Sequence, residues 1–502
     1  MVIDSHGRIA KIADGDSEAE VLAQFDIEAS GVKRLQTGQF MVPGFVDTHV
    51  HAPQYKFTGT GTDMPLMEWL KQYTFPAEES CKDLDSAQYR YDLLIKRFLF
   101  NGTTTAMYHG SLHLAPNKVL VDRILALGQR AVVGKVNMDC ESPDTYVEET
   151  ADGLREAEEF VQYTIAKACS RIQPCITPRF IPTCTPALMK GLAALARKYN
   201  IHIQSHISEC CGAVSFVKEQ HPNYASDAAV FDDMGLLTDK TVMAHGTLLS
   251  DSDFRLLAAK GTAVAHCPLS NFFLGDACFR VNHALSLGVK VGLGTDVAGG
   301  ISPSMLTAQR MAVVNSRCLR AHKLANSGGI VVTPEMEVDV ITYKEALWLA
   351  TIGGAQALGL QHVIGSFEEG RELDALLVDT QVSGGPFDIF EGETDHEKVE
   401  KFLNLGDDRN IAEVYIQGTF AHPRDPTRAC VSAVCARRPL TPYLLCRGVC
   451  VRRGEVFLTG QASQAPATLV GKNKSATATA VPDLSVCDDV PAPAEHKRTR
   501  LL

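Results

Sequence analysis

Eight short apolar runs, separated by longer amphipathic segments, constrain the fold of this chain more than any other sequence feature. Each run has the length of a strand, and each intervening segment is long enough for a helix, which is the pattern of parallel strand–helix units. The runs are FVDTHV from Phe45, TTTAMYH from Thr103, AVVGKVNM from Ala131, IQPCITP from Ile172, IHIQSHI from Ile201, TVMAHG from Thr241, TAVAHC from Thr262 and KVGLGTD from Lys290. Eight such units close a barrel, so we expect an α/β fold of the (β/α)8, TIM-barrel type.

The segments between the runs predict helices that cover the outside of the barrel. Examples are Ala87 to Phe100, Val147 to Ala168 and Pro186 to Tyr199, each of which is amphipathic. A doubly wound open sheet is the competing architecture. It would gather its polar residues at one switch point near a glycine-rich first turn, and the sequence has no such turn.

The two ends of the chain have a different pattern. Residues 1–42 alternate short apolar pieces with turn glycines, and residues 363–418 return to short strands and turns. We expect these two segments to pair as a small composite β-sandwich beside a catalytic barrel of residues 43–362. Residues 419–502 form a C-terminal extension that is rich in Ala, Ser, Thr and Pro from about position 461, which predicts disorder there.

Composition excludes several classes of protein. The net charge of -11 comes without a long basic run, which argues against nucleic acid as a partner, and no apolar stretch is long enough for a membrane span. The fifteen cysteines follow no regular framework, and the N-terminus lacks the apolar core of a secretory signal. We therefore expect a cytoplasmic protein with reduced thiols and a small-molecule ligand. A structural zinc site could use four cysteines, but their spacing is a poor match to known zinc-binding motifs; they are Cys430, Cys435, Cys446 and Cys450.

Residues of catalytic type stand at the C-terminal ends of most runs, where a barrel keeps its active site. They are His49, His51, Arg179, His206, Glu209, His245, His266 and Asp296. Residues i and i+2 of a strand share a face, so the imidazoles of His49 and His51 converge. Two imidazoles at the end of a buried strand predict half of a metal site, and two solvated histidines are the alternative.

The other half of the metal site is predicted at two later strand ends. A catalytic metal takes about three or four protein ligands and leaves one position for water. His206 and Asp296 complete such a set with His49 and His51, and the glycines after Asp296 would let the backbone turn over the site. Taken singly, His206 also suits a buried core position and Asp296 a helix cap.

Hydrolysis at such a site also needs groups that move protons. A bound zinc ion lowers the pKa of water towards neutrality, and the leaving group then needs a proton donor. Glu209, three residues after His206, is assigned as general acid and proton shuttle, with a solvated loop carboxylate as the alternative. Asp296 would accept the proton of the water, and His245 would orient the hydroxide unless it is structural. His266 is expected to line the pocket.

With these residues in place, the chain resembles the guanine deaminases of the amidohydrolase superfamily. The matching phrases run in order from about residue 40 to 418 and are VPGFVDTHVHAPQY, MEWLKQYTFPAE, NGTTTAMY, VGKVNMD, TPRF, HIQSHISE, TVMAHG, AHCPLSN, GLGTDVAGG, GGAQALGL and LGDDRNIAEVY. The resemblance implies a (β/α)8 barrel with a composite sandwich, one Zn²⁺ per subunit, conversion of guanine and water to xanthine and ammonia, and a cytosolic homodimer. Family members reach the phrase VIDSHGRIAKI only after further sequence, so we expect one or two sandwich strands to be missing.

Carried over residue by residue, the resemblance assigns roles to individual side chains. The metal ligands are His49, His51, His206 and Asp296, and the catalytic residues are Glu209, His245 and Asp296. The purine would be held by Gln54, Trp69, Arg179 and Phe180, with His206, Glu209 and Asp296 also facing it. Arginine offers two parallel donors, and guanine presents the acceptors O6 and N7 where adenine presents a donor amine, so Arg179 favours guanine. The alternative for Arg179 is a structural ion pair in the barrel wall.

Several rival functions share parts of this pattern. Binuclear enzymes of the hydantoinase or dihydroorotase type need a lysine on strand four, and that strand reads CITPRF here. Another deaminase or dechlorinase of the same fold would act on cytosine, a modified adenosine or a triazine, and the phrases TPRF and MEWLKQYTFPAE argue against it. The deaminases with a cysteine-rich zinc site are excluded because their H-x-E and P-C-x-x-C pair is absent. A non-catalytic scaffold of this fold would have gaps among the metal ligands. Zinc is preferred over iron only by the resemblance.

Overall fold

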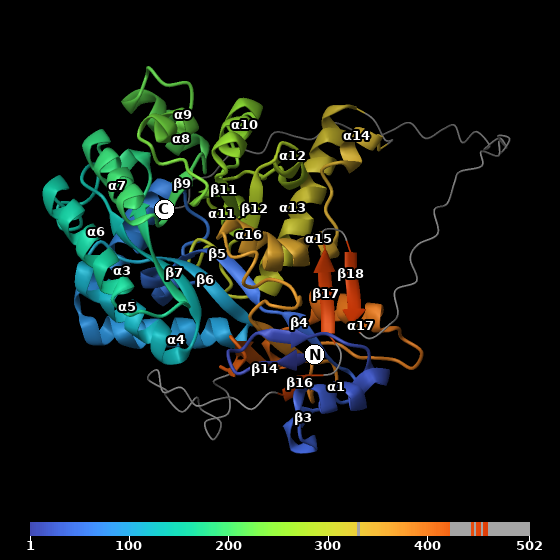
Figure 1. Ribbon diagram of the computed structural model, residues 1–502. Helices are drawn as coiled ribbons and strands as arrows, with labels where there is room; N and C mark the ends of the chain where they lie inside the picture. The colour runs from blue at the N-terminus through green and yellow to red at the C-terminus, as the bar shows by residue number, and fades with distance from the viewer. Residues whose placement is uncertain (329–331, 422–442, 446–447, 453–454, 460–502) are drawn as a thin grey trace, which may run out of the picture. The chain divides into compact units, whose positions relative to one another are not determined.

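Eight parallel strands, β5 to β12, form the core of the structure (Figure 1). The structure is a computed structural model that describes residues 1–328, 332–421, 443–445, 448–452 and 455–459. The strands are β5 Phe45–His51, β6 Thr103–His109, β7 Arg130–Asn137, β8 Ile172–Pro178, β9 His202–Ile207, β10 Thr241–His245, β11 Ala263–His266 and β12 Lys290–Leu293. They pair in chain order, and every one of them falls within or next to a predicted run. The predicted barrel is confirmed.

Backbone hydrogen bonds bring the first and last strands together. The amide of Asp296 donates to the carbonyl of His49 over 2.9 Å, and the amide of His51 donates to the carbonyl of Val297 over 2.8 Å. Because these bonds join the segment after β12 to the end of β5, the C-terminal ends of all eight strands form one ring. Side chains at those ends therefore face a common space.

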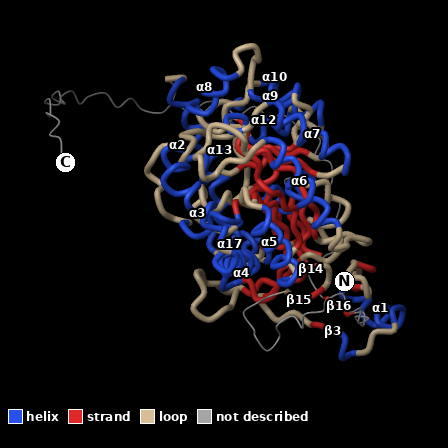
Figure 2. Tube along the Cα trace, turned by 90° about the vertical axis from the view of Figure 1, so that its left-hand side faces the viewer, coloured by secondary structure: helices blue, strands red, loops and turns tan. Residues whose placement is uncertain are grey.

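Helices surround the strands, as Figure 2 shows. The predicted helix Pro186–Tyr199 is α7, with the same bounds. Its ends follow from the sequence, because the hydroxyl of Thr185 accepts from the Leu188 amide and Asn200 adopts a left-handed conformation at the other end. The longer helices are α4 Leu84–Phe100, α5 Leu114–Leu127, α6 Thr150–Ile165, α8 Cys211–Gln220, α10 Asp251–Lys260, α13 Met305–Asn326 and α17 Asp395–Leu405. The shorter ones include α1 Glu18–Phe25, α2 Leu66–Trp69, α3 Phe75–Glu79, α9 Asp227–Asp233, α11 Pro268–Phe273, α12 Val281–Ser286, α14 Pro334–Glu337, α15 Tyr343–Trp348 and α16 Gly354–Ala357.

Two small sheets combine segments from both ends of the chain. One sheet has the order β15-β14-β13-β4, and the other has the order β2-β1-β16-β3. Their bounds are β1 Val2–Ile3, β2 Ile9–Lys11, β3 Val32–Lys33, β4 Gln39–Pro43, β13 Ala375–Asp379, β14 Ile411–Ile416, β15 Thr419–Phe420 and β16 Tyr443–Leu445. Ile3 and Ile9 of the second sheet share one buried apolar cluster with Met41, Leu377 and Tyr415 of the first. The predicted composite sandwich is confirmed.

The strand pairing of the sandwich continues beyond residue 418, into β15 and β16. The bounds given above for the three parts of the chain stay predictions. A hairpin of β17 Gly448–Arg452 and β18 Glu455–Thr459 follows. The disorder predicted from about residue 461, and the side chains of the cysteine group 430, 435, 446 and 450, lie outside what the structure describes. Within the described residues, no helix combines the length and the apolar character that crossing a bilayer requires.

Candidate active site

Two histidines at the end of β5 and one aspartate after β12 meet at the C-terminal mouth of the barrel. The Nε2 atom of His49 lies 3.1 Å from Oδ1 of Asp296, and Nε2 of His51 lies 3.4 Å from the same oxygen. The ligand atoms of these three residues all lie within 4.8 Å of one another. The i and i+2 spacing in β5 thus produces the convergence that the sequence predicts.

His206 enters the same group from the end of β9. Its Nε2 atom lies 3.0 Å from Nε2 of His51, and its Nδ1 atom donates to the backbone carbonyl of Arg179 over 2.6 Å. That carbonyl fixes the tautomer and leaves Nε2 free to bind a metal, which is the usual arrangement for a ligand histidine. His206 is therefore adjacent to the set of His49, His51 and Asp296, and we call these four predicted ligands the metal-ligand group.

The ionisation of these four side chains suits a divalent cation. Burial lowers the pKa of His49, His51 and His206, so the imidazoles stay neutral, which is the form that binds metal. Burial alone would raise the pKa of Asp296, but the neighbouring His49 and His245 outweigh it and the pKa falls to about 2. Nε2 of His49 is buried and makes no hydrogen bond within the described structure. Three neutral nitrogens and one carboxylate oxygen fit zinc.

Left-handed backbone conformations orient the side chains at the barrel mouth. Ser208, His245 and Asp296 have φ values of 46°, 74° and 50°. Non-glycine residues adopt such values at a cost, and they are concentrated at functional sites. The turn at Ser208 is held by Asp227, whose carboxylate accepts from both the amide and the hydroxyl of Ser208 at 3.0 Å. This turn directs Glu209 back towards the barrel.

The turn predicted at the glycines after Asp296 leaves no room for a side chain at Gly300. A side chain on Gly300 would place its first carbon 1.8 Å from the carbonyl oxygen of Thr295. The Gly300 amide instead donates to the Asp296 carbonyl over 2.6 Å. The loop can close over Asp296 only because this position has no side chain.

Glu209 and His245 lie beside the metal-ligand group. Oε1 of Glu209 is 3.7 Å from Nε2 of His245, and that nitrogen is 4.0 Å from Oδ2 of Asp296. Burial raises the pKa of Glu209, and Asp296 adds to the shift, while His245 opposes it. A carboxyl group with a raised pKa can both give and take a proton near neutral pH.

A cavity of about 380 Å³ opens onto this group. Its walls include all seven residues predicted to face the purine, together with His51, His245 and three apolar side chains. The predicted purine-facing residues are Gln54, Trp69, Arg179, Phe180, His206, Glu209 and Asp296. Sequence segments from β5 to beyond β12 thus contribute to one pocket.

Arg179 is anchored by a buried carboxylate that the sequence analysis did not single out. Nη1 and Nη2 of Arg179 donate to the two oxygens of Glu78, over 2.7 and 3.1 Å. Glu78 is 0% exposed and also accepts from Nε2 of Gln54 over 2.8 Å and from the hydroxyl of Tyr146 over 2.9 Å. The sequence analysis gave a structural ion pair as the alternative role of Arg179. The structure shows that Arg179 forms such an ion pair, with Glu78, and also lines the cavity. Glu78 lies in the phrase MEWLKQYTFPAE, but no local pattern marks it as a partner of Arg179.

Sequence reasoning also missed three further polar residues near the metal-ligand group. Asp47 accepts from the amide and the hydroxyl of Thr295, over 3.0 and 2.5 Å, and so ties β5 to the segment that carries Asp296. Burial raises the pKa of Asp47 to about 7. Oδ1 of Asn271 accepts from Nδ1 of His245 over 2.9 Å, which leaves Nε2 of His245 as an acceptor facing the cavity. The third residue is His109, at the end of β6.

His266 does not line the cavity, contrary to the expectation. Its ring packs against Phe279, with 5.3 Å between the ring centroids, and its Nδ1 atom lies 3.5 Å from Nδ2 of Asn271. Because Asn271 also accepts a hydrogen bond from His245, His266 contacts the residue that orients His245 and does not face the cavity.

Comparisons with known proteins identify the family of this chain. The model of the amidohydrolase family matches residues 40–421. Guanine deaminase of Mus musculus is 41% identical over 421 residues, which are 83% of this chain and 90% of that protein. Guanine deaminase of Escherichia coli is 31% identical over 392 residues, which are 77% of this chain and 84% of that protein. The crystal structure of guanine deaminase from C. acetobutylicum with guanine bound in the active site has a TM-score of 0.73 and 33% identity, and covers 83% of this chain and 93% of that one. The chain belongs to the amidohydrolase family and, within it, to the guanine deaminases.

Proposed function

We propose that this protein catalyses the hydrolytic deamination of guanine, in which water replaces the exocyclic amino group and xanthine and ammonia are formed. One observation carries the proposal: a single cavity brings Arg179 and aromatic side chains together with Glu209 and the metal-ligand group. The related proteins are guanine deaminases, and one of them has guanine bound. The protein is accordingly a hydrolase that acts on a carbon–nitrogen bond of a cyclic amidine.

Arg179 supplies the selectivity for guanine. Its two hydrogen bonds to Glu78 use two of the five N–H groups of the guanidinium, and the others remain for a ligand in the cavity. Guanine presents O6 and N7 as acceptors, whereas adenine would place an amine against a positive charge. Trp69 and Phe180 supply aromatic surface for the purine, and the amide of Gln54 supplies a polar contact.

His49, His51, His206 and Asp296 would hold one zinc ion per subunit. Bound there, zinc would supply water that is acidic enough to ionise near neutral pH. The preference for zinc over iron rests on the family, since three imidazoles and a carboxylate suit several divalent ions.

Glu209 moves protons in the proposed reaction. It takes one proton from the attacking water and gives it to the ring nitrogen next to the carbon under attack. The second proton of the water leaves the new hydroxyl, is taken up by Asp296 and passes through Glu209 to the amino group, which leaves as ammonia when the C–N bond breaks. Its raised pKa and its position 3.7 Å from His245 support both steps. His245 accepts a hydrogen bond at Nε2 and so orients the water, while the anionic Asp296 receives a proton. Burial of all three side chains keeps bulk water away from the reacting atoms.

The test is an assay of ammonia release from a panel of bases by the purified full-length protein. The panel contains guanine, adenine, cytosine and an aminotriazine, and a metal-depleted sample is measured before and after zinc is restored. We expect rapid release from guanine alone and its loss on metal depletion. Faster release from another base, or none from guanine by folded zinc-loaded protein, would refute the proposal.

Two further proposals rest on the resemblance to guanine deaminases. We infer that the protein is a homodimer and that it acts in the cytoplasm. Sedimentation velocity tests the first, and a mass equal to that of one chain would exclude it.

A further inference from the structure

His109 stands at the C-terminal end of β6, directly beside the metal-ligand strand. In the parallel pairing of β6 with its neighbours, His109 is opposite His51 of β5 and Gly134 of β7. Paired residues of a parallel sheet point to the same face, so the ring of His109 turns towards the interior together with that of His51. Gly134 has no side chain to compete for this space. His109 is 0% exposed.

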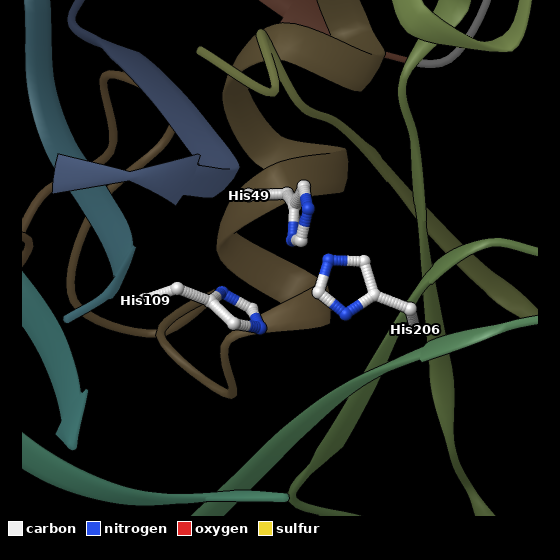
Figure 3. Close-up of side chains that lie close together, drawn as sticks. All are labelled: His49, His109 and His206. Atoms are coloured by element: carbon white, nitrogen blue, oxygen red, sulfur yellow. The ribbon is translucent and has the colours of Figure 1, made fainter. Parts of the chain in front are cut away.

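The ring of His109 is in contact with all three imidazoles of the proposed metal site. The ring centroids lie 4.7 Å from that of His49, 4.6 Å from that of His51 and 4.9 Å from that of His206. One ligand atom each of His49, His109 and His206 can be chosen so that all three lie within 4.8 Å of one another. Figure 3 shows these three rings turned towards a shared space. The structure thus contains a second set of three ligand atoms, which shares His49 with the set of His49, His51 and Asp296.

Neither ring nitrogen of His109 has a hydrogen-bond partner in the described part of the chain, although both are buried. A buried polar group left without a partner destabilises the folded chain, so such groups are nearly always bonded to another group. An imidazole whose nitrogens are both unpaired in the described residues, and whose ring contacts three other imidazoles, is placed as a metal ligand would be.

The two sets of ligand atoms are close enough to serve a single ion. Metal–nitrogen bonds of about 2.0–2.1 Å allow two ligand atoms of one ion to be about 4 Å apart. The ligand atoms within each set are at most 4.8 Å apart, so only a small movement of the side chains is needed for them to bind one ion. The sets share His49, and Nε2 of His206 in one set lies 3.0 Å from Nε2 of His51 in the other, so one ion with an additional ligand accounts for both.

We propose that His109 coordinates the bound divalent cation, together with His49 and His206. The centre then offers four imidazoles and one carboxylate, one more ligand than the family resemblance assigns. A catalytic zinc site uses about three protein ligands and a water, so the additional nitrogen strengthens retention of the ion and competes for its open position. This inference rests on the metal centre of the proposed function but does not depend on guanine as the substrate.

A crystal structure of the zinc-loaded wild-type protein, with anomalous scattering at the zinc edge, tests the proposal directly. We expect one anomalous peak at about 2.0–2.1 Å from a ring nitrogen of His109. A peak more than 3 Å from both His109 nitrogens, with His49, His51, His206 and Asp296 bound, would overturn it. No guanine is present, so this result is independent of the reaction assay.

The variant His109→Phe provides a second test in solution, because phenylalanine keeps an aromatic ring and removes both nitrogens. We expect the dissociation constant for zinc to rise about 100-fold or more, since the loss of even an outer partner of a metal ligand costs 10–100-fold. We also expect the visible absorption of the cobalt-loaded protein to change in shape. The matched control is His113→Phe, which replaces a nearby histidine whose ring packs on Tyr146, 5.4 Å between the ring centroids.

In the control variant, zinc affinity and the cobalt spectrum should equal those of the parent. If a folded His109→Phe protein also binds zinc as tightly as the parent and has the same cobalt spectrum, His109 is not a ligand. If this variant does not fold, the anomalous peak in the wild-type protein decides the question.

Discussion

At the scale of single residues, Glu209 is the side chain whose environment fits proton transfer best. It is buried, burial raises its pKa, and Oε1 of its carboxyl lies 3.7 Å from Nε2 of His245. We predict that Glu209→Gln, which keeps the shape of the side chain, lowers kcat for guanine by about two to four orders of magnitude, the range for a lost general acid or base. Zinc content and guanine affinity should remain close to those of the parent.

Steady-state kinetics, together with metal analysis and equilibrium binding of guanine, measure this effect. The control is Glu219→Gln, an exposed carboxyl on α8. Equal kcat in Glu209→Gln and the parent would remove Glu209 from the mechanism.

Glu78 is the positioning residue for the guanine-binding side of the pocket, because it holds both Arg179 and Gln54. Glu78→Gln would leave the buried guanidinium of Arg179 without its counter-charge, and breaking such a pair costs about 3–5 kcal/mol of stability. We further predict a higher KM for guanine and tighter inhibition by anionic purines, which an uncompensated positive charge attracts.

Urea unfolding and inhibition constants for neutral and anionic purines distinguish these effects. Glu79→Gln is the matched control, because the adjacent Glu79 is only half-buried and pairs with Lys82. A variant Glu78→Gln that loses stability but keeps both its KM and its preference among purines would show a merely structural role.

At the scale of the element, β9 carries a pH-sensitive residue, His202, at its start and a predicted metal ligand, His206, near its end. Nε2 of His202 donates to the carbonyl of Leu358 over 2.9 Å, and burial lowers the pKa of His202 to about 4 from the usual value of 6.5. Between pH 6.5 and 4 the unfolded chain therefore binds more protons at His202 than the folded chain does. The free energy of unfolding must fall as the pH falls through this window, and the contribution of His202 is about 3 kcal/mol.

His202→Gln keeps a donor for Leu358 and removes the titrating group. We predict that this variant loses about 3 kcal/mol less stability than the parent between pH 7 and pH 4. Urea unfolding at a series of pH values measures the difference. Parallel curves for the two proteins would contradict the prediction.

At the scale of the whole molecule, one buried ionic group connects the bottom of the barrel to the composite sandwich. Arg130, the first residue of β7, donates to both oxygens of Asp374, over 3.0 and 3.1 Å, and to Glu372 over 2.6 Å. Asp374 directly precedes β13 and also accepts from the amide of Gln417 over 2.8 Å. Arg130 is 3% exposed, so water does not screen these interactions.

We predict that Arg130→Met destabilises the protein by about 3–5 kcal/mol, because two carboxylates are left buried without their partner. Activity per folded molecule should stay unchanged, since Arg130 is at the end of the barrel opposite the cavity. Urea unfolding and kinetics on the folded fraction measure both quantities. Arg171→Met, which removes a single hydrogen bond to Gln417, is the control, and equal losses in the two variants would contradict the special role of Arg130.

Local patterns in the sequence predicted much of the fold and part of the site. The eight apolar runs predicted the strands, the amphipathic segment from Pro186 to Tyr199 predicted α7, and the i and i+2 spacing of His49 and His51 predicted their convergence. Glu209 was predicted because it comes three residues after His206, a predicted metal ligand. His109 carried the same signal, a histidine at the end of a predicted strand, yet its contact with three imidazoles became visible only in three dimensions.

The sequence by itself determined the strand count, the shared face of His49 and His51 and the membership of a family, because these follow from residue types at short spacing. Only the tertiary structure decided which buried polar groups pair: Arg179 with Glu78, Arg130 with Asp374, and Asp47 with the hydroxyl of Thr295. Those partners are far apart along the chain, and closure of the barrel brings them into contact. Once they are buried, a charge that cannot be hydrated requires a partner, and no local sequence pattern specifies which one.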